Sequence, residues 1–210
     1  MSDSSKPIRS STNDNRSIVS LLTGTTAGVG AWLAGYLVTY AVVAPDIRES
    51  PLNRLVEAFE GEAATYEMVG WVFYNAHFVE TVFRDVPLVG TTTTSYVGGE
   101  DGFTALLYLV PVVTLLAVGL GLGWYRGEAD PAKGAVAGVM VLPGYFLATA
   151  VGVHLVEVTL GEASGAPDPL AALFLAGIVY PALWAGMGGA IGAIIAGDPR
   201  SAIPEHRPSK

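Results

Sequence analysis

The sequence contains no cysteine, few charged residues and little positive charge. Without cysteine, the chain has no disulfide, no thiolate ligand for a metal and no catalytic thiol. Charged residues make up 14% of the 210 residues and hydrophobic residues 51%, whereas an ordinary soluble domain is about 25% charged. This composition indicates an integral membrane protein.

Lysine is especially scarce, with three residues beside eight arginines and 19 acidic residues, and the net charge is −8. Proteins that bind nucleic acid neutralise phosphates with lysine and arginine, so we expect no nucleic-acid partner. The sequence also shows neither a glycine loop that could bind phosphate nor a nucleophile beside a base. These absences favour a protein that is not an enzyme.

Four apolar segments are each long enough to cross a bilayer, which requires about 20 helical residues. We predict these spans at about residues 18–44, 103–124, 134–159 and 170–196. Polar tails flank them at residues 1–17, expected to be disordered, and at residues 197–210. The predicted fold is therefore all-α, an integral membrane bundle of four transmembrane helices over residues 18–196.

Glycine and proline are frequent within the predicted spans. Gly24 and Gly28 leave a small-residue face on which another helix can approach closely. Pro111, Pro143 and Pro181 interrupt three of the spans. Transporters use such breaks to expose carbonyl groups to ions, but proline is also tolerated in membrane helices without that role.

Residues 45–102 form the long loop between the first two spans and hold ten acids against three arginines. Ser50 and Pro51 predict the start of an amphipathic helix that runs through Phe59 and ends at Gly61. Residues 62–84 have apolar side chains at helical spacing and predict an interfacial or re-entrant helix, with Trp71 at the membrane interface.

The distribution of basic residues predicts the orientation of the chain. If the N-terminus is inside, the inner segments hold eight basic residues and six acids, while the outer segments hold three basic residues and 13 acids. Cytoplasmic segments of membrane proteins are enriched in lysine and arginine. We therefore predict a plasma-membrane protein with both termini in the cytoplasm and residues 45–102 outside.

The pattern His-x-Val-Glu occurs twice, at residues 77–80 and 154–157. Residues three apart on a helix share a face, and both copies are expected near the outer membrane surface. Two imidazoles and two carboxylates suit zinc, manganese or iron, or a proton relay. The alternatives are a hydrogen-bonded structural link between the loop helix and the bundle, or unrelated interfacial residues. The candidate polar or metal-binding cluster consists of His77, Glu80, His154 and Glu157.

The segment Tyr66–His77 (YEMVGWVFYNAH) and the segment Gly98–Phe103 (GGEDGF) resemble a family of small haloarchaeal multi-pass membrane proteins of uncharacterised function. The resemblance covers most of the chain apart from its two tails. It implies a four-span membrane protein and assigns no catalytic residues.

These observations favour a non-enzymatic membrane protein, either a transporter-like bundle or an accessory subunit, with no cofactor. Its expected partners are the lipid bilayer and either another membrane protein or further copies of itself. The alternative is a metal-dependent membrane enzyme that uses a divalent metal at the paired His-x-Val-Glu motifs. That alternative requires His77 and His154 to lie close together.

Overall fold

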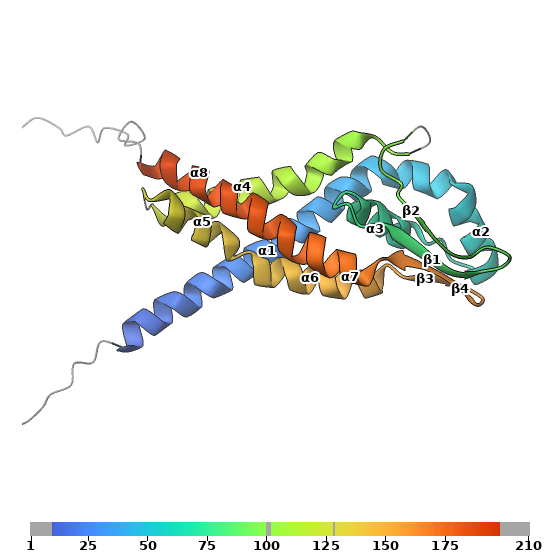
Figure 1. The fold of residues 1–210 in the computed structure, drawn as a ribbon, viewed down its shortest axis with the longest axis horizontal. Helices are drawn as coiled ribbons and strands as arrows, with labels where there is room; N and C mark the ends of the chain where they lie inside the picture. Colours follow the sequence, from blue (N-terminus) through green and yellow to red (C-terminus); the bar gives the residue numbers. More distant parts are fainter. Residues whose placement is uncertain (1–9, 100–101, 128, 198–210) are drawn as a thin grey trace, which may run out of the picture.

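A computed structural model of the protein describes residues 10–99, 102–127 and 129–197. Four helical segments of this part are long and apolar enough to cross a membrane: Ile18–Glu49, Ala105–Arg126, Pro131–Leu155 and Pro169–Gly197. They form an elongated bundle, with a smaller group of helices and strands at one end (Figure 1). We call this group, residues 50–104 and 156–168, the cap. The start of the first helix and the end of the last lie at the end opposite the cap (Figure 1).

The four long segments differ in how continuous they are. Their elements are α1 (Ser10–Glu49), η1 (Ala105–Tyr108) with α4 (Leu109–Arg126), α5 (Pro131–Val139) with α6 (Leu142–Leu155), and α7 (Pro169–Ala171), η2 (Ala172–Val179), η3 (Pro181–Ala185) and α8 (Gly186–Gly197). Two of the breaks coincide with proline, which cannot donate a backbone hydrogen bond. Pro143 lies in the first turn of α6, and Pro181 opens the second of two π-helical stretches, η2 and η3.

The structure tests only part of the prediction that both ends of the chain are polar tails. Helix α1 begins at Ser10, inside the segment that we predicted to be a disordered tail. The tail predictions for residues 1–9 and 198–210 lie outside the described residues.

Glycines allow the long helices to pack backbone against backbone. A Cβ on Gly119 of α4 would collide with the carbonyl oxygen of Ala185, just before α8. A Cβ on Gly28 of α1 would collide with the carbonyl oxygen of Val141, at the junction of α5 and α6. The predicted small-residue face of the first span is therefore confirmed, and this junction is what packs on it.

The cap begins with two helices, α2 (Pro51–Glu60) and α3 (Thr65–Asn75). The side chain of Ser50 accepts a hydrogen bond from the backbone N–H of Asn53, and Gly61 ends α2 in the left-handed region with φ 81°. The predicted start and end of this helix are confirmed. Leu55 and Phe59 are exposed on it, whereas Val56 is buried.

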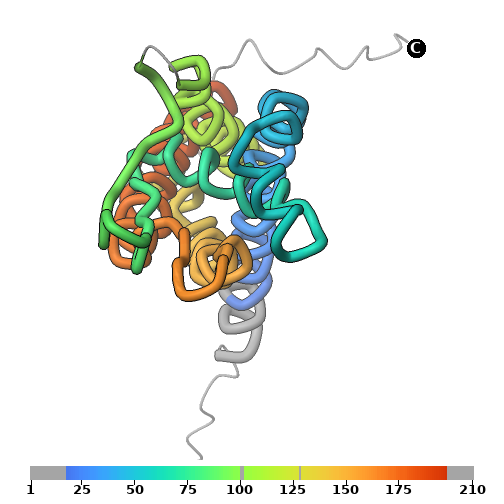
Figure 2. The backbone as a smooth tube through the Cα atoms, turned by 90° about the vertical axis from the view of Figure 1, so that its right-hand side faces the viewer, coloured from blue at the N-terminus to red at the C-terminus, as the bar shows by residue number. Residues whose placement is uncertain are grey.

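Helix α3 is buried on nearly all sides. Every residue from Met68 to Asn75 is buried, and the helix packs against α1 and contacts α6 and the strands of the cap. In the view from the cap end, α3 lies among the ends of the long helices (Figure 2). A helix that is apolar around its whole circumference is normally buried. Trp71 is accordingly only 2% exposed, so its predicted place at the membrane interface is wrong.

The cap also contains a four-stranded antiparallel sheet, so the all-α prediction is wrong in this part of the molecule. Its strands are β1 (Thr81–Val86), β2 (Gly90–Thr94), β3 (Val158–Leu160) and β4 (Ala163–Pro167). They lie in the order β2-β1-β4-β3, with Phe83 opposite both Thr92 and Gly165. Two hairpins far apart in the sequence therefore join into one sheet.

The predicted single helix over residues 62–84 ends at Asn75 because the turn after it is fixed by side-chain and backbone geometry. Phe78 has φ 60°, which is incompatible with a continuing helix. The Asn75 amide donates to the carbonyl oxygen of Val79 at 2.6 Å and accepts from the backbone N–H of Tyr96 at 2.8 Å. These bonds redirect the chain into β1.

Candidate functional site

His77 is a fully buried histidine in the turn after α3, with an exposed fraction of 0%. Its Nδ1 lies 2.8 Å from the carbonyl oxygen of Phe73, and its Nε2 lies 2.8 Å from the hydroxyl oxygen of Tyr145 in α6. A carbonyl oxygen can only accept, so Nδ1 carries the proton and Nε2 accepts from the Tyr145 hydroxyl. His77 is therefore a neutral imidazole whose two ring nitrogens are both occupied.

Aromatic rings surround this imidazole. The ring centroids of Phe73 and Tyr180 each lie 4.8 Å from that of His77. Burial lowers the pKa of His77 from 6.5 to about 4, and the hydrogen bond to the Phe73 carbonyl opposes this shift. The hydroxyl of Tyr74 donates to the carbonyl oxygen of Thr149 at 2.8 Å. The bonds from His77 and Tyr74 therefore join the end of α3 to α6.

The other three residues of the predicted cluster have exposed side chains. Glu80 precedes β1, His154 lies in the last turn of α6, and Glu157 lies beyond the end of that helix. His154 and Glu157 therefore do not share a helical face. Among the residues that the structure describes, no group of three or more His, Asp or Glu could hold a metal ion.

The structure thus does not bring the four predicted residues together as a metal site. His77 fits the alternative of a hydrogen-bonded structural link between the loop helix and the bundle, and its partner in the bundle is the hydroxyl of Tyr145. The repeated pattern has a structural reading as well. Both copies lie where a helix is followed by a strand, and the valine is buried in each of them, Val79 in the first and Val156 in the second.

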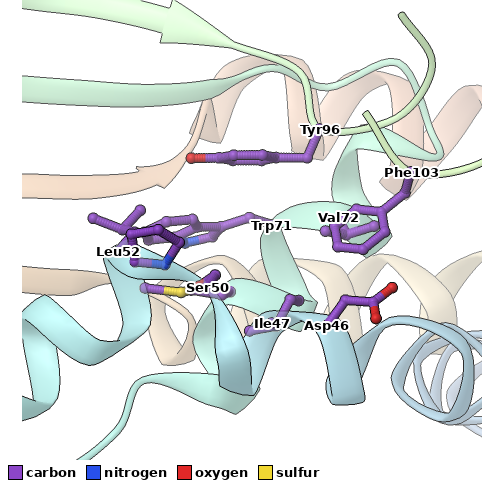
Figure 3. Close-up of a pocket in the computed structure, with 10 residues that line it drawn as sticks. Asp46, Ile47, Ser50, Leu52, Trp71, Val72, Tyr96 and Phe103 are labelled. Carbon is purple, nitrogen blue, oxygen red and sulfur yellow. The ribbon is translucent and has the colours of Figure 1, made fainter. Parts of the chain in front are cut away.

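A pocket of about 220 Å³ opens in the cap beside the end of α1. Among the residues that line it, Tyr96 lies over Trp71, Leu52 lies beside Trp71, Ser50 lies below, and the carboxylate of Asp46 lies beneath Phe103 (Figure 3). We call this the small pocket. Its walls come from α1, α2, α3 and the segments on either side of residues 100–101.

Trp71 is the rigid wall of the small pocket. Its indole N–H donates to the carbonyl oxygen of Val156 at 2.7 Å. The ring of Tyr96 stacks on it with a centroid distance of 6.2 Å and an interplanar angle of 17°, and Phe83 meets it edge to face at 5.4 Å. Because its donor is occupied, Trp71 offers the small pocket an apolar surface with a π-face.

A second hollow of about 510 Å³ lies between α2 and the sheet. We call it the apolar groove. No charged residue of the described ranges lines it, and its walls include Leu55, Val56, Phe83 and Leu160. Leu52 and Trp71 line both hollows, so these two side chains separate the small pocket from the apolar groove.

Among the residues that the structure describes, Asp46 is the only charged residue that lines either hollow. Arg48, the nearest basic residue along the chain, instead donates to the Tyr40 hydroxyl at 2.7 Å and lies over the Tyr40 ring. Within the described part of the chain, Asp46 has no basic partner. The small pocket therefore joins an unneutralised carboxylate to aromatic walls.

The sequence patterns did not reveal either hollow, because the walls come from segments that are far apart in the chain. One signal was available: residues 68–74 are apolar or aromatic throughout, which indicates a buried helix and a buried Trp71. Asp46 gave no signal of its own, since acidic residues are common throughout residues 45–102.

Comparison with known proteins adds a family but no activity. No curated protein and no solved structure matches the chain. A family model, described as a family of unknown function (DUF7978), matches residues 3–196. The match covers nearly the whole chain, and the protein belongs to this family of unknown function.

Proposed function

We propose that this protein is a non-enzymatic accessory protein of the plasma membrane whose cap is a binding module on the outer side. In this proposal the four long helices cross the bilayer and both termini are cytoplasmic. Support comes from the length and apolar character of the four helices and from the excess of basic residues in the inner segments. The described helix ends opposite the cap fit the same orientation (Figure 1).

The observation that carries the binding role is the pair of hollows that meet at Leu52 and Trp71. Ligand sites are usually preformed apolar hollows of about 300–1,000 Å³ with a few polar groups. The two hollows together have that size, and Asp46 and Ser50 supply polar groups at one end. Both hollows are in the cap, where a ligand could be reached from outside the bilayer.

The packing of the long helices favours an accessory bundle over a transporter-like one. At Gly119, Gly123 and Gly188 the backbones of α4 and the last span are so close that a Cβ would collide. A transporter requires a path lined by polar groups between its helices. Further copies of the chain or another membrane protein remain the expected partners of the accessory form.

The contacts of His77 disfavour the alternative function, a metal-dependent membrane enzyme. That function needs His77 to offer a ring nitrogen to a metal, and both nitrogens are engaged by Phe73 and Tyr145. No other observation favours it.

The binding role can be tested by native mass spectrometry of the full chain purified from its membrane. Thr92 is an exposed residue of β2 that lines the apolar groove, and Thr93 is its exposed neighbour that does not. Adjacent strand residues point to opposite faces, so Thr92→Trp fills the groove while Thr93→Trp does not. Both substitutions suit a strand.

We expect the parent and Thr93→Trp proteins to retain one small molecule of defined mass after detergent is removed in the gas phase. Thr92→Trp should lose it. If the parent protein carries no molecule, or if both variants retain it equally, the binding role of the cap is wrong.

A further inference from the structure

We propose that the cap binds an amphiphile with a positively charged head, placing the head beside Asp46 in the small pocket and the hydrocarbon tail in the apolar groove. This inference rests on the proposed function of the cap as a binding module. It adds the chemical class of the ligand.

The head group is identified by the charge and the aromatic surfaces of the small pocket. Of the described residues, Asp46 is the only charged one that lines the small pocket, and it is not neutralised by Arg48, which is engaged with Tyr40. A cation is attracted to a carboxylate and also to the faces of tryptophan and tyrosine rings. The rings of Trp71 and Tyr96, which stack on each other, line the pocket and give it an aromatic wall.

The fixed orientation of Trp71 makes the site more selective for a cation. Its N–H is used by the carbonyl oxygen of Val156 and is not free to bind an anion or a neutral acceptor. Phe103 has no hydrogen-bonding group. A quaternary ammonium group, which needs no hydrogen-bond acceptor, suits such walls.

The tail is identified by the apolar groove, whose described walls include no charged side chain. A ligand that passes over the shared wall of Leu52 and Trp71 would put its charged end near Asp46 and its apolar end against Val56 and Leu160. Burying apolar surface there contributes about 25 cal/mol for each Å² removed from water. The two hollows thus suit the two ends of one molecule.

The charge of the surrounding segments favours the same class of ligand. Residues 45–102 hold ten acids and three arginines. A surface of one sign concentrates ligands of the opposite sign and repels those of the same sign. We therefore expect an amphiphile with a cationic head to bind more tightly than one of equal chain length with an anionic head.

The test uses the full chain in nanodiscs of digalactosyldiacylglycerol, whose head group carries no charge. Isothermal titration calorimetry, with empty nanodiscs as the blank, compares decyltrimethylammonium, decyl glucoside and decyl sulfate below their micellar concentrations. Asp46→Asn removes the pocket charge. The matched control is Asp85→Asn, which removes a cap charge that lines neither hollow; its φ of 54° is one that asparagine adopts readily.

We expect saturable binding in the order decyltrimethylammonium, decyl glucoside, decyl sulfate. Asp46→Asn should weaken only decyltrimethylammonium, by about three- to tenfold, and Asp85→Asn should leave all three unchanged. Thr92→Trp should weaken both decyltrimethylammonium and decyl glucoside, because it fills the space for the tail.

The inference would be overturned if Asp46→Asn and Asp85→Asn changed the affinity for decyltrimethylammonium equally. It would also be overturned if decyl sulfate bound more tightly than decyltrimethylammonium. If none of the three probes binds while native mass spectrometry still finds a molecule that Thr92→Trp displaces, the inference fails and the binding role stands. If no probe binds and no molecule is found, both are wrong.

Discussion

At the scale of single residues, His77 shows how a titratable group can serve structure. The imidazole is neutral, its Nδ1–H is bonded to the Phe73 carbonyl oxygen, and its Nε2 accepts from Tyr145. Protonation would leave a charge among aromatic rings and turn Nε2 into a donor. This is the physical reason why burial lowers the pKa of His77 to about 4.

The lowered pKa predicts that His77 makes stability depend on pH. In the unfolded chain a histidine has a pKa of about 6.5, so between about pH 6.5 and 4 the unfolded state binds more protons than the folded state. The free energy of unfolding must then fall as the pH is lowered through this range. Between pH 7.5 and pH 5.0 the loss from His77 is about 2 kcal/mol.

Thermal unfolding in a neutral detergent measures this loss. We expect the difference in Tm between pH 7.5 and pH 5.0 to shrink by several degrees in His77→Gln, because glutamine does not titrate. The exposed His154 provides the control, and His154→Gln should keep the pH dependence of the parent. An unchanged slope in His77→Gln would show that His77 does not carry the effect.

At the scale of elements, α4 contains two glycines with different surroundings. One lies in the close contact with the last span, and the other does not. A Cβ on Gly119 would collide with the carbonyl oxygen of Ala185, whereas nothing lies within 4 Å of a Cβ on Gly121. Both positions are helical, but only Gly119 is in close contact with another backbone. Substituting alanine at each position therefore distinguishes the effect of close packing from the effect of alanine on helix stability.

We expect Gly119→Ala to lower the free energy of unfolding by about 1–3 kcal/mol, because the two helices must separate to admit the methyl group. Gly121→Ala should be neutral or stabilise the protein by up to about 1 kcal/mol, because alanine favours a helix more than glycine does. Thermal unfolding of both variants at one pH measures the difference. Equal Tm values would mean that the close contact at Gly119 does not contribute to stability.

The elements also show which local predictions succeeded. The start and end of α2 followed from Ser50, Pro51 and Gly61, because capping and turn chemistry depend on neighbours in the sequence. The end of α3 could not be predicted from neighbouring residues, because Asn75 accepts a hydrogen bond from Tyr96, which lies 21 residues away. The strands were not predicted for the same reason. Strand β1 pairs with β4, and two spans separate these strands in the sequence.

At the scale of the whole molecule, four apolar helices could be predicted from length and composition alone, because both properties are local. The candidate site could not be predicted. Its walls come from three helices, the four strands of the sheet and several loop residues, and the residues that stood out by their pattern, His77 and His154, lie in different environments. Long-range packing decides which polar residue is buried and which carboxylate faces a hollow.

The proposed function requires a chain that crosses the membrane four times with its cap outside. Because the sequence has no cysteine, a single introduced cysteine is the only thiol that a maleimide can label. Glu60 and Ala129 are both exposed; Glu60 ends α2 in the cap, and Ala129 lies between α4 and α5 at the other end of the bundle. The measurement is labelling of Glu60→Cys and Ala129→Cys in intact cells with a membrane-impermeant maleimide, before and after permeabilisation.

We predict that Glu60→Cys is labelled in intact cells and that Ala129→Cys is labelled only after the membrane is permeabilised. Labelling of Ala129→Cys, and not Glu60→Cys, in intact cells would place the cap in the cytoplasm and contradict the proposed orientation. Recovery of both proteins in the soluble fraction would contradict the membrane assignment itself.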